Sequence, residues 1–323
     1  MLIRLSALGD ILRVLPAWLN IVHAFPSARI QAVIEDRHSF LLEPIPQIEP
    51  VLLNRKKLSN PIQAIGELSR IARLIKGATA SLDFHGILKS ALIPYLAGIK
   101  ERWGDGISKE GAGLLQTKRP AYKKQNRYSQ ALGLSESFGN VYGIPDLGHF
   151  RPIFKTAKLP TNTAWPLPET NTRKRILLVP GTSSAGANKR WSIQRWLQLA
   201  KVLNSTADLR WSLGPIEETM RQWLPQKSGV EALPAMPFWE LASTIRTADR
   251  VIVCDTGLLH LSVLLGVPVT ALFGPSDPII SGLPNGAGKI IRAGVECSPC
   301  RERKCLRQTC MEHIHLEQVL ATI

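Results

Sequence analysis

Short apolar runs alternate with longer helical patterns along the first half of the chain. Strands are predicted at Leu2–Leu5, Arg29–Glu35 and Ser81–Phe84, where apolar and β-branched residues cluster. Ile11–Phe25 and Ile87–Ala97 carry apolar residues at the spacing of an amphipathic helix. This alternation of strand and helix predicts a parallel sheet whose strands are joined by right-handed helical crossovers.

The alternation begins again after a segment rich in proline and threonine. Lys158–Arg175 shows little periodicity and is typical of a linker between domains. Beyond it we expect strands at Arg175–Val179, Leu209–Leu213, Arg250–Cys254 and Pro268–Phe273, and helices at Ile193–Leu203, Glu218–Leu224, Phe238–Ala248 and Leu258–Leu265. The chain is therefore predicted to be an α/β protein with two Rossmann-like, doubly wound domains, residues 1–160 and 161–323.

Length and composition agree with this picture. A chain of 323 residues favours two domains at roughly 100 to 200 residues each, and 45% hydrophobic residues exclude a disordered chain. No run approaches the ~18 apolar residues of a membrane-spanning helix. The first residues lack the charged segment, apolar core and cleavage site of a signal peptide. We therefore expect a cytoplasmic protein that reaches a membrane only from its surface.

The charge predicts an anionic partner. The formal net charge is +15, and residues 1–160 contribute most of it, with 22 basic and 12 acidic side chains. The densest basic stretch, Lys109–Arg127, is either an ordinary solvated loop or a landing surface for an acidic acceptor or a membrane. A nucleic-acid-binding protein is disfavoured, because no nucleic-acid module is recognisable and no aromatic residues are interleaved with the basic ones.

Candidate chemistry follows the strands, because ligands of open α/β sheets bind beyond the carboxyl ends of the strands. After the first strand, Ser6–Asp10 places an acid where the chain turns into a helix. Asp10 is either a helix cap or a general base. The sequence alone does not separate these two interpretations.

A second candidate site follows the strand that ends at Val179. The segment Pro180–Trp191 is rich in small residues, which let backbone N–H groups approach an anion, and Lys189 adds a charge just before a helix. It lacks the ending of a Walker loop and the glycine spacing of a dinucleotide fingerprint. It is predicted to bind phosphate, the alternative being a flexible surface loop.

A third candidate site follows the strand that ends at Cys254. Asp255 comes first, and Thr256 and Gly257 then open a helix whose free N–H groups could hold a pyrophosphate. His260 lies one turn further along, on the side that can face the same ligand. An isolated histidine is more often structural, but its position behind Asp-Thr-Gly favours a functional role.

Taken together, these motifs resemble the ADP-heptose:lipopolysaccharide heptosyltransferase family, glycosyltransferase family 9. The resemblance spans residues 2–278 and rests on Leu5–Asp10, His85–Ser90, Gly181–Trp191, Asp255–His260 and Phe273–Asp277. It implies a GT-B fold, with the two domains facing each other across a cleft. It also implies a cytoplasmic enzyme, peripheral on the inner membrane, that needs no cofactor and no catalytic metal. Such an enzyme transfers a heptose from ADP-heptose to the inner core of lipopolysaccharide with inversion.

The resemblance assigns roles to individual residues. Asp10 matches the general base, and Lys189 matches the residue that offsets the charge of the departing ADP. The first domain would then bind the acceptor, near His85 and Lys89, and the second would bind the donor. The residues that match donor contacts are Thr182 and Ser183 (diphosphate), Asp255, Thr256, Gly257 and His260 (sugar and pyrophosphate), Glu217 (ribose) and Met236 (adenine). A GT-B transferase for another nucleotide sugar would share most of these features.

A cysteine-rich tail has no role in the resemblance. Cys297, Cys300, Cys305 and Cys310 form the pattern C-x2-C-x4-C-x4-C. The spacing is compatible with a structural zinc site, and redox-sensitive or buried unpaired thiols also fit. The expected cytosolic location argues against stable disulfides, because the cytosol keeps thiols reduced. Cys254, inside a predicted strand, is expected in the core.

Overall fold

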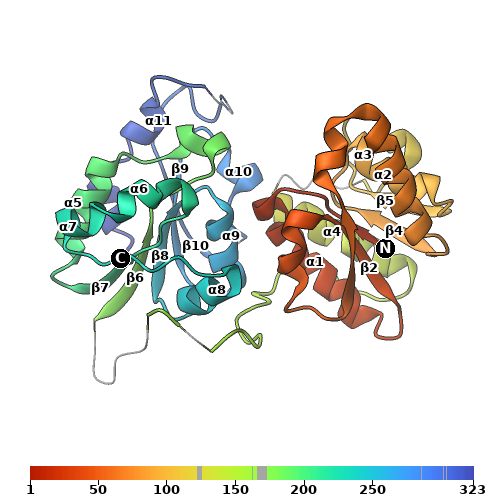
Figure 1. The fold of residues 1–323 in the computed structure, drawn as a ribbon, viewed down its shortest axis with the longest axis horizontal. Coiled ribbons are helices and arrows are strands. Elements are labelled where there is room, and N and C mark those ends of the chain that lie inside the picture. Colours follow the sequence, from red (N-terminus) through yellow and green to blue (C-terminus); the bar gives the residue numbers. More distant parts are fainter. Residues whose placement is uncertain (122–125, 162, 166–172, 285, 301, 303) are drawn as a thin grey trace. The chain divides into compact units, whose positions relative to one another are not determined.

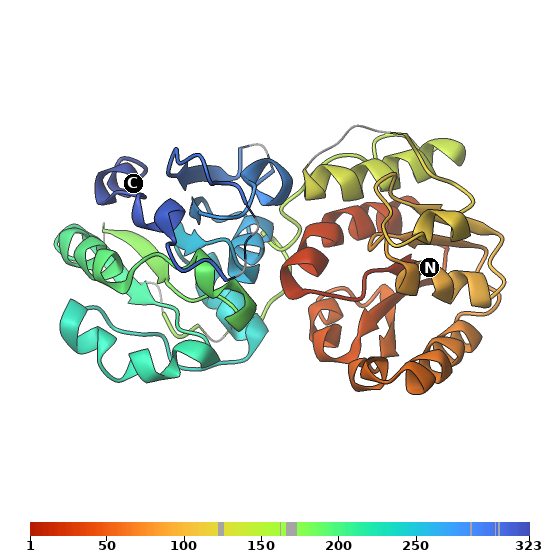
Figure 2. The same ribbon diagram turned by 90° about the horizontal axis from the view of Figure 1, so that it is seen from above.

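The computed structural model describes residues 1–323 except 122–125, 162, 166–172, 285, 301 and 303 (Figures 1 and 2). The chain divides into two compact units, Met1–Arg151 and Pro152–Ile323. Among the described residues, each unit has a parallel sheet of five strands, and the two sheets share no strand. The predicted pair of parallel α/β domains is therefore confirmed, and the division falls after Arg151 rather than after residue 160.

The first unit has the Rossmann strand order. Its strands are β1 (Leu2–Ile3), β2 (Ile30–Glu35), β3 (Ile48–Leu53), β4 (Ala80–Asp83) and β5 (Glu101–Gly104). Its helices are α1 (Leu8–Ala24), α2 (Pro61–Leu74), α3 (Leu88–Leu96) and α4 (Arg127–Val141), with shorter 3-10 turns η1 (Asp36–Leu42), η2 (Arg55–Ser59) and η3 (Ala112–Leu115). The sheet order β3-β2-β1-β4-β5 places β1 at the centre.

Helix α1 packs against α4, and α2 packs against α3 (Figure 2). The buried face of α1 includes Ile11, Leu15 and Trp18. The helix begins at Leu8, earlier than predicted, so Asp10 lies in its first turn. Strand β1 is shorter than predicted, although the Arg4 N–H still donates to Val33 O at 3.2 Å.

The second unit has a different strand order. Its strands are β6 (Lys174–Val179), β7 (Ala207–Trp211), β8 (Arg250–Cys254), β9 (Val269–Phe273) and β10 (Gly288–Arg292). Its helices are α5 (Ile193–Leu203), α6 (Glu218–Arg221), α7 (Leu224–Ser228), α8 (Phe238–Arg246), α9 (Gly257–Leu264), α10 (Pro278–Ser281), α11 (Thr309–Glu312) and α12 (Leu316–Leu320), with 3-10 turns η4 (Ser184–Lys189) and η5 (Pro215–Glu217). The order β10-β9-β8-β6-β7 is that of flavodoxin-like sheets.

Three tryptophans form much of the core of the second unit. The ring of Trp196 lies edge-on to Trp191 and Trp211, with centroid distances of 5.3 and 6.2 Å. Met311 and Ile314, near the end of the chain, are buried in the same core. The last helices therefore close the unit instead of forming a loose tail.

The described part of the segment predicted as a linker packs on the second unit. Trp165 is buried, and its Nε1 donates to Asp208 Oδ2 at 2.8 Å. The Arg175 guanidinium lies over the Trp165 ring, 4.2 Å from its centroid, and donates to Trp165 O at 2.6 Å. Before Lys158, the Phe154 N–H donates to Leu264 O at 2.8 Å, so that part of the chain also packs on the second unit.

The predicted surface features are only partly described. No helix within the described ranges is long and apolar enough to cross a membrane. Of the basic stretch Lys109–Arg127, Lys123 and Lys124 lie outside the described residues. Arg127 is described, and it is the first residue of α4.

Candidate functional site

The predicted sites fall at the two topological switch points of the sheets. In the first unit β1 lies between β2 and β4, and in the second unit β6 lies between β7 and β8. Asp10 and His85 follow β1 and β4, whereas Lys189 and Asp255 follow β6 and β8. Ligands of doubly wound sheets bind at such points, so each unit offers one candidate site.

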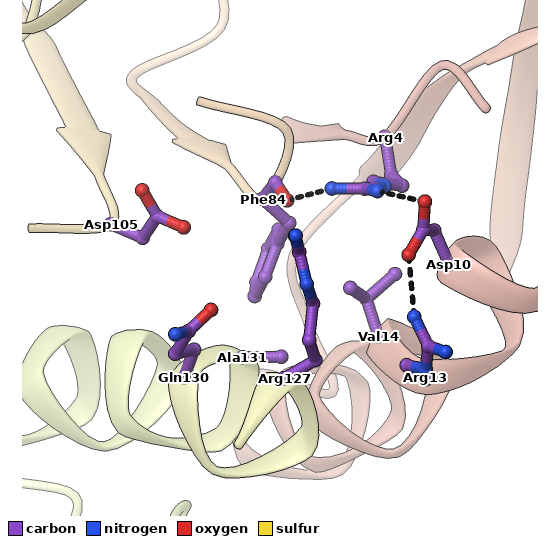
Figure 3. A pocket seen from close by; sticks show the side chains of 9 residues that line it. All are labelled: Arg4, Asp10, Arg13, Val14, Phe84, Asp105, Arg127, Gln130 and Ala131. Carbon is purple, nitrogen blue, oxygen red and sulfur yellow. Dashed lines mark hydrogen bonds and ion pairs between the residues drawn. The ribbon is translucent and has the colours of Figure 1, made fainter. Parts of the chain in front are cut away.

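In the first unit, two arginines hold Asp10 (Figure 3). Asp10 Oδ2 lies 2.8 Å from Arg4 Nη2, and Oδ1 lies 2.7 Å from Arg13 Nη1. Arg4 also donates to Phe84 O at 2.7 Å, which joins the segments after β1 and β4. The N-cap position of α1 belongs to Ala7, so Asp10 is not the helix cap, although it lies in the first turn, where its charge suits the helix dipole. With 30% of its side chain exposed, Asp10 remains open to a ligand.

The loop after β4 is fixed beside this carboxylate. Asp83 accepts hydrogen bonds from the backbone N–H groups of His85 and Gly86 and from Ser90 Oγ, at 2.9, 3.2 and 2.9 Å. Burial raises the pKa of Asp83 to about 6. His85 Nδ1 accepts from the Leu5 N–H at 3.3 Å. Burial, followed by the charge of Arg4, lowers the pKa of His85 to about 3, so the ring is neutral and carries its proton on Nε2.

In the second unit, the segments after β6 and β8 are joined by an ion pair. Lys189 Nζ lies 2.6 Å from Asp255 Oδ2, and the Asp255 side chain is 5% exposed. Burial opposes ionisation of Asp255, but the Lys189 charge and the hydrogen bonds from Lys189 and Ser276 outweigh it. The pKa of Asp255 therefore lies below its usual value. The structure thus brings together the two residues predicted to act on the same diphosphate.

A second ion pair joins the segments after β6 and β7. Arg190 Nη2 lies 3.1 Å from Glu217 Oε1, and Arg190 also donates from Nε to Thr182 Oγ1 at 3.0 Å. Glu217 covers Gly181 so closely that a Cβ there would lie 2.5 Å from Glu217 Oε2. Sequence reasoning missed Arg190, although it follows Lys189 directly in the loop already predicted to bind phosphate.

The start of helix α9 offers donors to an anion. Thr256 occupies the N-cap position, and its side chain makes no capping hydrogen bond. Its Oγ1 is buried without a hydrogen-bond partner. Gly257 opens the helix, and His260, one turn on, is 1% exposed and lies near Asp255. A buried hydroxyl beside the free N–H groups of a helix start fits a phosphate oxygen.

Three predicted contacts are less complete. The Thr182 hydroxyl donates to Gly186 O at 2.9 Å, so its hydrogen is already used. Ser183 is exposed at the start of η4. Met236 is half-buried, and its Sδ lies 3.8 Å from Thr244 Oγ1.

The four tail cysteines, Cys297, Cys300, Cys305 and Cys310, line one cavity of the second unit, and none is in a disulfide. Cys310 is buried, and burial together with the three neighbouring thiols raises its pKa. Among the residues that the structure describes, no three Cys, His, Asp or Glu side chains are arranged to hold a metal ion. The described residues therefore offer no preformed site in support of the zinc interpretation. Cys254 is fully buried, which confirms its place in the core.

Comparison with known proteins places these features in one family. The family whose sequence model matches residues 69–311 is described as "Glycosyltransferase family 9 (heptosyltransferase)". Lipopolysaccharide heptosyltransferase 1 of Escherichia coli K12 is 27% identical over 310 residues, which cover 90% of this chain and 91% of that protein.

Two solved structures share the fold. The glycosyl transferase family 9 protein of Veillonella parvula matches with a TM-score of 0.77 and 19% identity, covering 99% of this chain and 94% of the other. The E. coli heptosyltransferase WaaC with ADP-2-deoxy-2-fluoro heptose matches with a TM-score of 0.74 and 21% identity, covering 99% and 98%. The predicted GT-B fold class is therefore confirmed.

Proposed function

Since this chain belongs to glycosyltransferase family 9, the heptosyltransferases, we propose that it transfers a heptose from ADP-heptose to the inner core of lipopolysaccharide. The single observation that carries the proposal is the convergence of Lys189, Asp255 and Thr256 at the switch point of the second sheet. A cation, a buried hydroxyl and the start of a helix together suit a diphosphate. The relative in complex with an ADP-heptose analogue supports the choice of nucleotide.

The second unit is the donor-binding unit in this proposal. Thr256 and the N–H groups at Gly257 bind the diphosphate, with the Ser183 hydroxyl and the Thr182 backbone N–H from the loop after β6. The Thr182 hydroxyl hydrogen is engaged with Gly186 O. Lys189 turns from Asp255 toward the departing phosphate and offsets its growing negative charge, an effect worth about 3 to 4 kcal/mol for one well-aimed donor. Asp255, freed from part of this ion pair, accepts hydrogen bonds from sugar hydroxyls together with His260.

The adenosine end of the donor lies toward β7 in this proposal. Glu217 accepts hydrogen bonds from the ribose hydroxyls, because its carboxylate is fixed by Arg190 at the carboxyl end of that strand. Met236 packs on the adenine. Gly181 keeps the approach to Glu217 open, since any side chain at this position would displace the carboxylate.

In this proposal the first unit binds the acceptor and supplies the base. Asp10 takes the proton from the acceptor hydroxyl while the hydroxyl oxygen attacks the anomeric carbon and the bond from that carbon to the ADP oxygen breaks. Attack from the face opposite ADP inverts the configuration. Arg4 and Arg13 keep Asp10 oriented, since each guanidinium holds one carboxylate oxygen, and the ionised carboxylate is the form that a general base requires.

The working location in this proposal is the cytoplasmic side of the inner membrane, to which the protein binds peripherally. The net charge of +15, concentrated in residues 1–160, supports contact with an acidic glycolipid surface. Flotation with anionic vesicles tests this point. Binding that disappears at high salt is expected, and equal binding to neutral vesicles would contradict it.

The central experiment is a transfer assay with ADP-heptose and lipopolysaccharide that lacks heptose. We expect release of ADP, a gain in acceptor mass equal to one heptose residue, and a product whose anomeric configuration is opposite to that of the donor. Parallel assays with UDP-sugars address the alternative that another nucleotide sugar is used. Turnover with a UDP-sugar and none with ADP-heptose would contradict the proposal.

A further inference from the structure

A small pocket lies at the switch point of the first sheet, beside Asp10 (Figure 3). The residues that line it are Arg4, Asp10, Arg13, Val14, Phe84, Asp105, Arg127, Gln130 and Ala131. Three arginines and two carboxylates therefore share one small space, and its lining carries a net positive charge. Such a lining favours an anionic ligand.

The three arginines are not equivalent. Arg4 and Arg13 are committed to Asp10 by ion pairs of 2.8 and 2.7 Å. The guanidinium of Arg127 makes no hydrogen bond and no ion pair with any residue that the structure describes. Figure 3 shows its side chain rising from α4 into the space between Asp10 and Asp105.

Arg127 is held in an environment that disfavours its charge. Burial lowers the pKa of Arg127, and the nearby charges of Arg4 and Arg13 act in the same direction. Asp10 and Asp105 counteract them without coming within ion-pair distance of the guanidinium. A half-buried cation without a hydrogen-bonded counter-ion is costly, and a planar guanidinium is well shaped to receive the two oxygens of a carboxylate or phosphate.

Across the pocket, one carboxylate oxygen of Asp105 also lacks a hydrogen-bond partner. Its Oδ1 is buried without a hydrogen-bond partner, and burial raises the pKa of Asp105. The backbone of Gly86 lies against this oxygen, because a Cβ on Gly86 would be 2.9 Å from it. The Asp105 carboxylate also accepts a hydrogen bond from the Ile107 N–H, and no hydrogen bond or ion pair among the described residues joins it to Arg127.

We propose that Arg127 binds an oxyanion of the acceptor, a carboxylate or a phosphate, next to the hydroxyl that Asp10 deprotonates. This inference rests on the proposed function. The bound oxyanion fixes the acceptor at a second point, so that the attacking hydroxyl faces the Asp10 carboxylate. Arg4 and Arg13 orient the base, Asp10, and Arg127 binds the substrate.

The test compares Arg127→Gln and Arg127→Lys with the wild type in the transfer assay. Arg127→Gln is expected to raise the acceptor KM about 10-fold or more, as for the loss of a charge-assisted hydrogen bond. The Kd of ADP-heptose, measured by titration calorimetry, should change less than about twofold. Arg127→Lys should recover part of the acceptor affinity, because it keeps the charge and loses the paired geometry. Arg73→Gln, at an exposed arginine of α2, is the matched control and should behave as wild type.

Modified acceptors identify the oxyanion. Acceptor treated with phosphatase and acceptor with its carboxylates reduced to alcohols are each assayed with the wild type and with both variants. The modification that removes the ligand of Arg127 should raise the wild-type KM and leave the KM of Arg127→Gln unchanged. If that variant does not fold, the same comparison is made with Arg127→Lys.

Three results would overturn the inference. They are an unchanged acceptor KM in Arg127→Gln, a loss of ADP-heptose affinity as large as the loss of acceptor affinity, or additive effects of Arg127→Gln with both acceptor modifications. A wild-type protein that transfers no heptose would instead contradict the proposed function, so the two failures are distinguishable.

Discussion

Lys189 and Asp255 form an ion pair of 2.6 Å although they follow different strands, β6 and β8, of the second sheet. The pair holds the Lys189 ammonium at the switch point before any donor arrives. A diphosphate bound at the start of α9 would compete with Asp255 for this cation. Donor binding and the ion pair are therefore expected to be coupled.

Replacement of Lys189 by Ala should weaken ADP-heptose binding and turnover together. The lost charge-assisted contact predicts about a 10-fold or larger increase in the Kd, with a larger fall in kcat because negative charge grows on the departing ADP. Titration calorimetry and initial rates measure both effects. Lys201→Ala, at an exposed lysine of α5, is the control, and an unchanged donor Kd in Lys189→Ala would place the diphosphate elsewhere.

Replacement of Asp10 by Asn should separate catalysis from binding. The change keeps the size of the side chain and removes its proton-accepting charge, so kcat should fall by roughly 10²- to 10⁴-fold. The Kd of ADP-heptose should stay close to that of the wild type. Asp146→Asn, at a side chain that is 82% exposed in the same unit, is the matched control. Full activity of Asp10→Asn would remove Asp10 from the mechanism.

Replacement of Gly181 by Ala tests the position of Glu217 without touching its charge. The added Cβ would lie 2.5 Å from Glu217 Oε2, so the carboxylate must move away from Gly181. We expect weaker binding of ADP and a smaller effect on binding of inorganic pyrophosphate, which has no ribose. Gly294→Ala, where a Cβ would meet nothing within 4 Å, is the control. Equal losses for ADP and pyrophosphate would contradict the ribose contact.

Replacement of His85 by Gln should make the protein less sensitive to acid. The pKa of His85 is about 3 in the folded chain against 6.5 for an ordinary histidine, so between these values the unfolded chain binds the extra proton. The free energy of unfolding therefore falls as the pH drops below about 6.5, by up to about 3 kcal/mol at pH 4.

Denaturant unfolding at several pH values measures this effect. As the pH falls from 7 to 4, the free energy of unfolding of His85→Gln should rise relative to that of the wild type. His149→Gln, at an exposed histidine, should leave the pH dependence of the wild type in place. A constant difference for His85→Gln across this range would show that burial of the ring does not couple folding to protons.

The positions of the sites could be predicted because buried parallel strands are continuous apolar runs with an abrupt end. The runs that end at Val179 and Cys254 show this plainly, and the residues after them lie at a switch point. The predicted ends of helices are less accurate where no side chain marks the end. Helix α1 begins at Leu8 with Ala7 in the N-cap position, and alanine gives no capping signal.

Side-chain contacts between segments far apart in the sequence could not be predicted. Arg13 lies three residues after Asp10 in a helix, a spacing that sequence reasoning could have used. Arg4 and Arg190 have no such signal, because their contacts depend on how β1 and β6 meet their neighbours. The linker interpretation overlooked Trp165. The burial of this large apolar ring stabilises the attachment of the segment to the second unit, although the surrounding prolines and threonines are typical of a loose linker.

The separate sheets of the two units have a thermodynamic consequence. Each strand that the structure describes pairs only with strands of its own unit, so one sheet can melt while the other keeps all its ladder bonds. Calorimetry should therefore resolve two heat-absorption peaks or one broadened peak whose van't Hoff enthalpy is smaller than the calorimetric enthalpy. A single melting temperature for this chain would average two different quantities.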